Sequence, residues 1–229
     1  MNPTNPTSPF NDPAAVAKYA EETPLKVPGL ADLHRMTMLL LAEHAPEEAD
    51  ILVLAAGGGL ELKAFAEAQP GWRFVGVDPS AEMLDLARHI LGPLQPRVQL
   101  QQGLIDAAPP GPFDGATCLL TLHLLQREER LRILQEMRRR LKPSAPLVVA
   151  QHSCPEGGEL RRWLTRSVAF STRTRIDFTR AAVFADIMAE RLPVLSVEED
   201  EALLREAGFS DVALFYAGFS LRGWVAAAA

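Results

Sequence analysis

Short apolar runs alternate with amphipathic stretches through the middle of the chain. The run Ile51–Leu54 leads into three consecutive glycines, and an amphipathic segment follows from Leu60 to Ala68. This order predicts a buried parallel strand, a tight turn and a helix. Further apolar runs predict strands over 72–77, 97–101, 113–121 and 146–150.

Helical patterns lie between several of these strands. Ser80 begins one predicted helix, with Glu82 in its first turn. Apolar residues at 131, 134, 137 and 141 form a helical stripe over 127–141. Strands that alternate with helices in this way form a parallel sheet that helices cover on both faces. We therefore expect an α/β fold.

The end of the chain departs from this alternation. A predicted helix over 198–207 precedes two strand-like runs, 209–217 and 218–226, which are joined too closely for a crossover helix. Two such neighbouring strands pair antiparallel. The pattern therefore predicts a Rossmann-like sheet of seven strands that ends in an antiparallel hairpin.

The glycine turn and an acidic residue after the second strand together predict a nucleotide-binding site. Asp78 lies nineteen residues after Gly59, at the tip of the 72–77 strand, where a ribose diol would be held. A dinucleotide fingerprint needs a third glycine so that the helix can pack close to the strand, and that position is Leu62. The pattern therefore favours S-adenosylmethionine (SAM), which has no pyrophosphate, over NAD.

The block 51–91 resembles the class I SAM-dependent methyltransferases, and Val77–Arg88 looks like the second-strand motif of that family. More particular resemblances, at 27–29, 121–125 and 215–224, are to the bacterial carboxy-SAM synthase group, which serves wobble-uridine modification in tRNA, and to its uncharacterised relatives. The resemblance implies N-terminal helices, a helical insertion after strand five, and methyl transfer from SAM to an unidentified acceptor, with S-adenosylhomocysteine (SAH) as product.

Carried over by position, the resemblance implies a SAM site built from the glycine turn and the ends of strands two to four. Its residues would be Ala55, Ala56, Gly57, Gly59, Asp78, Pro79, Met83, Leu104, Ile105 and Leu119. Arg35, in an early helix expected over 31–45, is the candidate for binding the methionine carboxylate.

Several residues differ from those that the resemblance implies. An acid, a glycine, an aspartate and an asparagine are replaced by Val53, Ala55, Leu104 and Leu119. Glu61, at the start of the first predicted helix, is a candidate substitute for the missing strand acid. The arginine that would bind the extra carboxylate of carboxy-SAM falls at Ala185, which favours a plain methyl donor. Carboxy-SAM synthesis, and SAM binding with little turnover, stay open as alternatives.

Two histidines are the candidate catalytic residues. Ligands of open α/β sheets sit outside the carboxyl ends of the strands. His123 follows the fourth predicted strand and His152 the fifth, so we expect both to flank the transferred methyl group and to accept a proton from a hydroxyl or amine acceptor. Alternatively, His123 simply begins the next helix and His152 caps its strand. We expect no metal site, because the spacing of these histidines and Cys154 is not that of a closed zinc site.

Residues 156–195 interrupt the fold between the fifth strand and the last helix, where such enzymes carry a lid. The net charge of the chain is −6, but this segment is locally basic. Asp177 is the single acid among six arginines, at positions 161, 162, 166, 173, 175 and 180. They indicate a small acidic substrate or RNA phosphate. The alternative is a solvated helix face over apolar residues that pack beneath it or against a second subunit. We expect a small-molecule substrate and leave RNA and a homodimer open.

Length and composition agree with one globular domain. The chain has 229 residues, 48% of them hydrophobic, and we expect a single domain over 14–229 after a disordered, Pro-, Asn- and Thr-rich tail over 1–13. No apolar run is long enough to span a membrane, and no signal peptide opens the chain. The two cysteines make no disulfide framework. We therefore expect a cytoplasmic protein.

Overall fold

The computed structural model of the chain describes residues 8–155, 160–172 and 175–229. At its centre is a sheet in the order β3-β2-β1-β4-β5-β8-β7, with the short β6 paired beside the end of β5. The strands are β1 (Asp50–Leu54), β2 (Arg73–Asp78), β3 (Val98–Gln102), β4 (Gly115–Leu119), β5 (Pro146–Cys154), β6 (Leu195–Ser196), β7 (Phe209–Gly218) and β8 (Leu221–Ala228).

Strand directions agree with the sheet that the sequence predicts. All pairs from β3 to β5 are parallel, whereas β8 runs antiparallel to both β5 and β7. The predicted seven-stranded sheet with an antiparallel final hairpin is therefore confirmed. The two-residue β6, which pairs in parallel with Ser153 and Cys154, is an addition that the sequence pattern did not predict.

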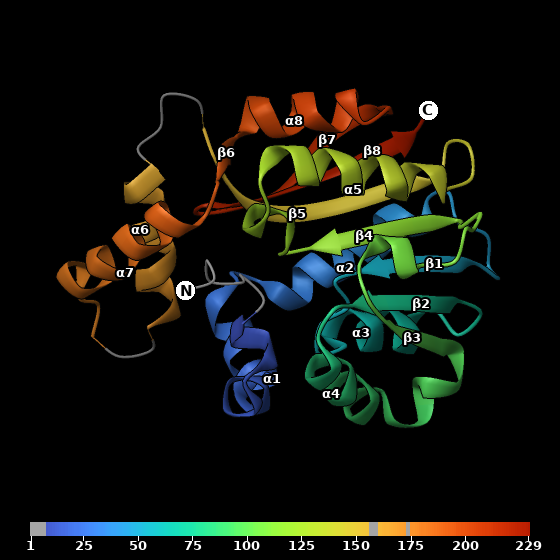
Figure 1. Cartoon of the computed structure of the whole chain (residues 1–229), viewed down its shortest axis with the longest axis horizontal. Helices are drawn as coiled ribbons and strands as arrows, with labels where there is room; N and C mark the ends of the chain where they lie inside the picture. Colours follow the sequence, from blue (N-terminus) through green and yellow to red (C-terminus); the bar gives the residue numbers. More distant parts are fainter. Residues whose placement is uncertain (1–7, 156–159, 173–174) are drawn as a thin grey trace.

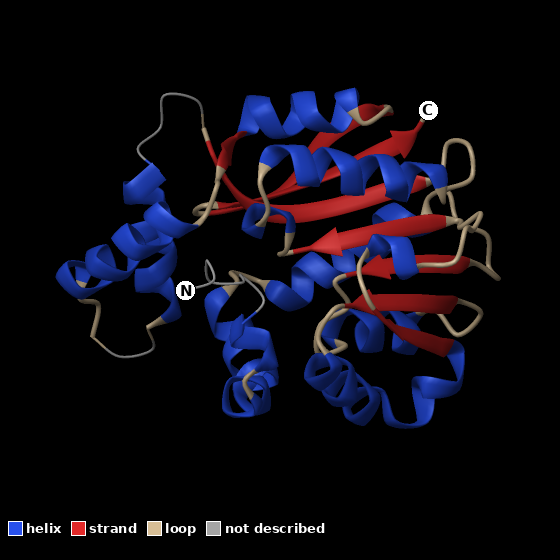
Figure 2. Cartoon of the chain, in the orientation of Figure 1, coloured by secondary structure: helices blue, strands red, loops and turns tan. Residues whose placement is uncertain are grey.

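Helices cover both faces of the sheet (Figure 2). They are α1 (Pro13–Lys26), α2 (Leu30–Ala42), α3 (Leu60–Ala68), α4 (Ala81–Leu91), α5 (Arg127–Arg139), α6 (Leu160–Ser171), α7 (Phe178–Arg191) and α8 (Val197–Glu206), with short 3₁₀ turns η1 (Ser8–Asn11), η2 (Gly92–Arg97), η3 (Ile105–Ala107) and η4 (Leu122–Leu124).

Strand β1 explains why its sequence is continuously apolar. Ile51 and Val53 pack into a core with residues of α2 and α3, whereas Leu52 and Leu54 pack on the other face with residues of α5 and α8. Successive side chains of a strand point to opposite faces, so a strand that is covered twice needs apolar residues at every position.

Three helices lie beyond the carboxyl ends of the parallel strands rather than on a face of the sheet. Figure 1 shows α1 below this edge and the antiparallel pair α6 and α7 projecting from it. The pair is the helical insertion predicted after strand five. Ligands of parallel sheets bind at this edge, so α1, α6 and α7 are placed to enclose them. Among the described residues, no helix combines the length and the apolar character needed to cross a membrane.

The N-terminal segment differs from the disordered tail predicted for residues 1–13. Residues 1–7 lie outside the described part of the chain, but 8–13 have regular structure. The carbonyl of Phe10 accepts a hydrogen bond of 2.6 Å from the Ser80 hydroxyl, and Asp12 caps α1 through the backbone N–H of Ala14. Pro13, one of the prolines whose number suggested disorder, occupies the first turn of α1, where its missing N–H costs nothing.

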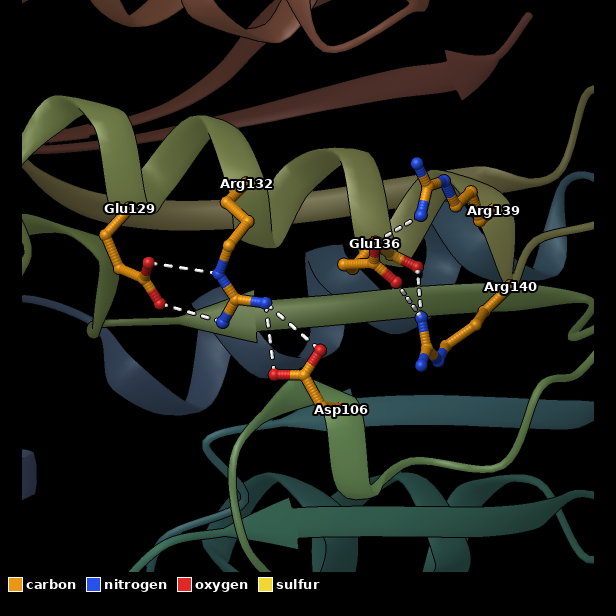
Figure 3. A network of polar contacts seen from close by, with 6 residues as sticks. All are labelled: Asp106, Glu129, Arg132, Glu136, Arg139 and Arg140. Carbon is orange, nitrogen blue, oxygen red and sulfur yellow. Dashed lines mark hydrogen bonds and ion pairs between the residues drawn. The ribbon is translucent and has the colours of Figure 1, made fainter.

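A surface network fixes α5 to the turn after β3 (Figure 3). Arg132 donates to both carboxylate oxygens of Asp106 at 3.1 and 3.0 Å and also binds Glu129, one turn earlier on the helix. Further along α5, a second set of ion pairs joins Glu136, Arg139 and Arg140. Ion pairs at the surface contribute roughly 0–1 kcal/mol each. The basic end of α5 is thus accounted for by local pairing.

Candidate active site

The turn after β1 brings bare backbone to the edge of the sheet. Gly57 and Gly59 have φ of 49° and 79°, which favour glycine. A Cβ at Gly59 would lie 3.0 Å from the Cα of Ala87, so this glycine lets α3 pack closely on α4. A Cβ at Gly57 would lie 3.3 Å from the phenol oxygen of Tyr19. Ala55 stands where the family has its first glycine and still adopts the left-handed conformation, at φ 56°.

Asp78 ties the end of β2 to this turn. Its Oδ2 accepts the backbone N–H of Gly57 at 2.9 Å, and its Oδ1 accepts the N–H of Ser80, also at 2.9 Å. The side chain is buried, and burial raises its pKa although the two backbone donors oppose the shift. The carboxylate that the sequence assigned to a ribose diol therefore also holds the glycine turn in place.

A cavity of about 320 Å³ opens between this turn, the ends of β2, β4 and β5, and the helices α1 and α2. Its volume falls at the lower end of the range for ligand sites in proteins. Nine of the thirteen site residues predicted from the sequence line it: Ala55, Ala56, Gly57, Asp78, Pro79, Met83, Leu119, His123 and His152.

The other four predicted residues do not line this cavity. Gly59 packs against α4, and Ile105 is buried in the core on the α5 face. Leu104, by contrast, is 53% exposed. Arg35 is exposed on α2, whereas the preceding residue, His34, is buried and lines the cavity. Consecutive helix residues point about 100° apart, so a shift of one position exchanges the inward and outward sides.

Several cavity residues were not predicted from the sequence. Tyr19 and Lys26 reach the cavity from α1, and Ser80 lies beside Asp78. Burial raises the pKa of Tyr19 to about 12, and the nearby Glu61 carboxylate adds to the shift. Nothing in the local sequence of α1 marks Tyr19, because only the packing of α1 on the glycine turn brings it to the site. Glu61, considered above as a substitute acid, also lines the cavity.

The two candidate catalytic histidines are in contact. His123 lies in η4 and His152 lies within β5, which extends four residues past its predicted end at 150. Their ring centroids are 4.7 Å apart with the planes nearly perpendicular. His152 Nδ1 is 2.8 Å from the Ser220 hydroxyl. His123 Nδ1 is buried and has no partner among the described residues.

Burial sets the protonation of both rings. It lowers the pKa of His152 to about 4, and it lowers that of His123 well below its usual value, with help from the neighbouring His152 and Arg130. Both imidazoles are therefore neutral near pH 7. A neutral imidazole whose Nδ1 donates to a hydroxyl has a free lone pair on Nε2, which can accept a proton.

A second, larger cavity of about 990 Å³ lies against α6 and α7 and shares His152 and Lys26 with the first. Its lining is mainly apolar, with Val168, Ile176, Phe178, Phe184, Ile187 and Met188. Two of the predicted arginines, Arg175 and Arg180, also line it.

The remaining predicted arginines are accounted for separately. Arg161 pairs with Asp186 on the surface, and the Arg166 guanidinium lies 4.4 Å over the ring of Trp163. Arg162 also has an interaction partner, and Arg173 lies outside the described residues. The charge of the insertion is therefore partly used in internal contacts rather than presented as one continuous patch.

Comparison with known proteins agrees with this arrangement. Residues 51–144 match the family model of a methyltransferase domain, while no curated protein matches the chain significantly in sequence. The SAM-dependent methyltransferase SibL in its apo form is similar in structure, with 17% identity over 97% of this chain and 69% of SibL and a TM-score of 0.61. PigF with SAH is similar at 17% identity over 99% of this chain and 63% of PigF, with a TM-score of 0.66.

A third similar structure is an O-methyltransferase family 2 protein from Planctomyces limnophilus in complex with apigenin. It is 17% identical over 86% of this chain and 61% of that protein, with a TM-score of 0.60. The chain thus spans 61–69% of the length of these three proteins. At such identities the likeness concerns the fold.

The strand order, the antiparallel last hairpin and the matched segment define a class I methyltransferase domain. This chain has the fold of that class, and its residues 51–144 match the model of a methyltransferase domain.

Proposed function

We propose that this protein transfers the methyl group of SAM to a small molecule bound against α6 and α7, with His152 as the proton acceptor. The observation that carries the proposal is the shared wall of the two cavities. His152 and Lys26 line both the cavity at the glycine turn and the larger one. A cofactor in the first and an acceptor in the second would therefore meet at His152.

The groups that line the first cavity suit the parts of SAM. The glycine turn lines the cavity at Gly57, whereas at Gly58 it packs against Tyr19, to which a Cβ would lie 2.9 Å away. Asp78 would hold the ribose, and Met83 and Leu119 would offer apolar contact to the adenosine. SAM supplies a methyl group that its sulfonium has already activated. The chain's task is then mainly to align the reactants and to exclude water.

His152 has the chemistry of a base at this position. Burial lowers its pKa to about 4, so the ring is neutral in the working range of pH and has a lone pair to accept a proton, although it is a weaker base than a free imidazole. The Ser220 hydroxyl, 2.8 Å from Nδ1, orients the ring. A proton from a hydroxyl or amine acceptor can pass to Nε2 as the acceptor atom attacks. His123 packs edge-on against this ring, so it is a positioning residue in the proposal.

The lining of the larger cavity favours a small acceptor over RNA. Apolar side chains outnumber cations there, and Arg175 and Arg180 are the only arginines among its described lining residues. An apolar skeleton that carries an acid group would satisfy both features. The similar Planctomyces protein is in complex with apigenin, which supports a small molecule as the kind of acceptor. A homodimer through the apolar residues of the Arg-rich insertion stays a prediction.

The finer resemblance to carboxy-SAM synthases receives less support. The position of the carboxylate-binding arginine is Ala185, which is fully buried in α7. Arg180 does line the larger cavity, but it stands five residues earlier on the helix. We therefore propose that plain SAM is the donor.

The test combines cofactor binding with turnover. SAM and SAH binding are measured by calorimetry, and methyl transfer is measured with isotope-labelled SAM and a panel of hydroxyaryl carboxylic acids. His152→Ala is expected to lower kcat by roughly 10²–10⁴ while the Kd for SAM changes little. His89→Ala, an exposed histidine on α4, is the matched control. Wild-type protein that binds neither compound would contradict the proposal, and binding without transfer to any small acceptor would favour the alternative of a SAM-binding protein with little turnover.

A further inference from the structure

Glu61 is a buried acid that has no counter-charge in the described part of the chain. It lies in the first turn of α3, is 7% exposed and lines the cavity at the glycine turn. The Thr117 hydroxyl donates to its Oε1 at 2.6 Å. Among the residues that the structure describes, no lysine, arginine or histidine forms an ion pair with it.

Such an acid is costly to keep charged. An ionised carboxylate out of water needs a cation or several hydrogen-bond donors, and Thr117 supplies a single one. Burial therefore raises the pKa of Glu61 to about 8, against the small opposing effect of Thr117. Near pH 7 the free protein holds a neutral carboxylic acid at the wall of its cofactor cavity.

The sheet order and the proposed site of methyl transfer together indicate which end of SAM this acid faces. β2 and β4 lie on opposite sides of β1, and the glycine turn follows β1. Asp78 stands at the β2 side of the turn, whereas Glu61 is bound to Thr117 of β4. If Asp78 holds the ribose and the methyl group lies at His152 of β5, as in the proposed function, the methionine portion of SAM extends toward the β4 and β5 side, where it carries an α-ammonium group.

We propose that Glu61 binds the α-ammonium of the methionine portion of SAM and releases its own proton when the cofactor binds. The proposal rests on the proposed function, because it assumes that SAM occupies this cavity. It also accounts for a sequence departure. The strand position that carries an acid in the family is Val53 here, and Glu61 supplies the negative charge from the helix instead.

The other titratable groups around Glu61 do not release this proton. Tyr19 has its pKa raised to about 12, and burial also raises the pKa of the Cys118 thiol. Burial keeps His34 and both candidate catalytic histidines neutral. Lys26 pairs with Glu22 at the surface. Asp78, whose pKa is also raised, is the one further acid among the described residues that line the cavity. Ligands with and without the amino-acid portion of SAM distinguish proton release by Asp78 from proton release by Glu61.

Calorimetric titration at pH 6.5 in phosphate and in imidazole gives both the Kd and the number of protons released. The ligands are SAM, SAH and 5′-methylthioadenosine, which keeps the ribose but lacks the amino-acid portion. The α-ammonium of free SAM is still protonated at this pH, since α-amino groups titrate near ~7.7–8.0. We expect wild type to release about one more proton with SAM and SAH than with 5′-methylthioadenosine.

Glu61→Gln keeps the side-chain shape and an acceptor for Thr117 but cannot ionise. It is expected to bind SAM and SAH about 10- to 100-fold more weakly, to lose the extra proton release, and to bind 5′-methylthioadenosine as wild type does. Glu67→Gln, an exposed position on the same helix, is the matched control and should change none of these values.

The outcomes separate two kinds of failure. If wild type binds SAM with no more proton release than 5′-methylthioadenosine, the proposal for Glu61 is overturned, and this count needs no variant. Equal weakening of all three ligands in Glu61→Gln would also overturn it, since the defect would then be structural. If wild type binds none of the three ligands, the proposed function itself fails.

Discussion

The Asp78 carboxylate and the Gly57 backbone N–H are joined by a hydrogen bond of 2.9 Å that links two neighbouring strands at the ligand edge of the sheet. Because Gly57 lies in the turn after β1 and Asp78 ends β2, one side chain fixes the relative position of the loop and of the acid that would hold the ribose. Removal of this carboxylate should thus affect loop geometry and ligand binding together.

Asp78→Ala is expected to weaken SAM binding by at least about tenfold and to lower the free energy of unfolding by roughly 1–3 kcal/mol, because it leaves two backbone donors without their acceptor. Calorimetry and urea unfolding measure the two effects. Asp85→Ala, an exposed acid on α4, should be close to wild type in both. Unchanged SAM affinity in Asp78→Ala would contradict the assignment of Asp78 to the site.

Ala55→Gly is expected to stabilise the protein. Ala55 has φ 56°, which costs an L-residue roughly 1–2 kcal/mol, whereas glycine adopts it freely and loses about 0.5–1 kcal/mol of unfolded-state entropy. The net gain should be several tenths of a kcal/mol or more in urea unfolding. Ala56→Gly is the control, because Ala56 does not have a positive φ. This substitution should destabilise the protein. Equal effects at both positions would argue against strain at Ala55.

Arg130→Met is expected to destabilise the fold by roughly 3–5 kcal/mol. Arg130 is fully buried, donates to the carbonyl of Leu125 at 2.8 Å and lies 3.4 Å from the Asp200 carboxylate, so its loss leaves an acid buried without a cation. Arg127→Met on the same helix removes an exposed pair with Glu206 and should cost less than about 1 kcal/mol. Thermal or urea unfolding measures the loss of stability in each variant. Similar losses in Arg130→Met and Arg127→Met would mean that the buried pair contributes no more than the exposed one.

The stability difference between wild type and His34→Gln should depend on pH. Burial lowers the pKa of His34 to about 4 in the fold, against ~6.5 when unfolded. Between these values the unfolded chain binds more protons, so the contribution of His34 is full above about pH 6.5 and falls by up to about 1.4 kcal/mol per pH unit toward pH 4.

The comparison with the variant is needed because Glu61 acts in the opposite direction. Its raised pKa favours the folded state at low pH, and that contribution is lost as pH rises toward about 8. Urea unfolding from pH 4.5 to 7.5 would measure the difference between wild type and His34→Gln. His44→Gln, at an exposed position, serves as the control. A difference that stays constant with pH would refute the prediction.

The sequence carries the fold more fully than the site. Ile51–Leu54 and the closely joined runs after Gly208 have local patterns that specify a doubly covered strand and a hairpin, and Asp78 follows from its spacing to the glycine turn. Tyr19 could not be found in this way, because it reaches the glycine turn only through the packing of α1.

The limits of β5 were also misjudged from local composition. The polar residues Gln151 and His152 suggested that the strand had ended, yet they pair with Arg222 and Leu221 of β8. Pairing with β8, a strand distant in the sequence, decides where β5 ends, so the local sequence alone does not predict that end.

The pairing of β5 with β6 has a consequence for how this protein could diversify. Ser153 is the register partner of Leu195, so the chain leaves the sheet and returns to it at adjacent strands, about 4.8 Å apart. The helices α6 and α7 therefore leave and rejoin the sheet at neighbouring positions. Evolution, or a protein engineer, could therefore exchange this module for another of different length and retarget the enzyme without disturbing the sheet or the glycine turn.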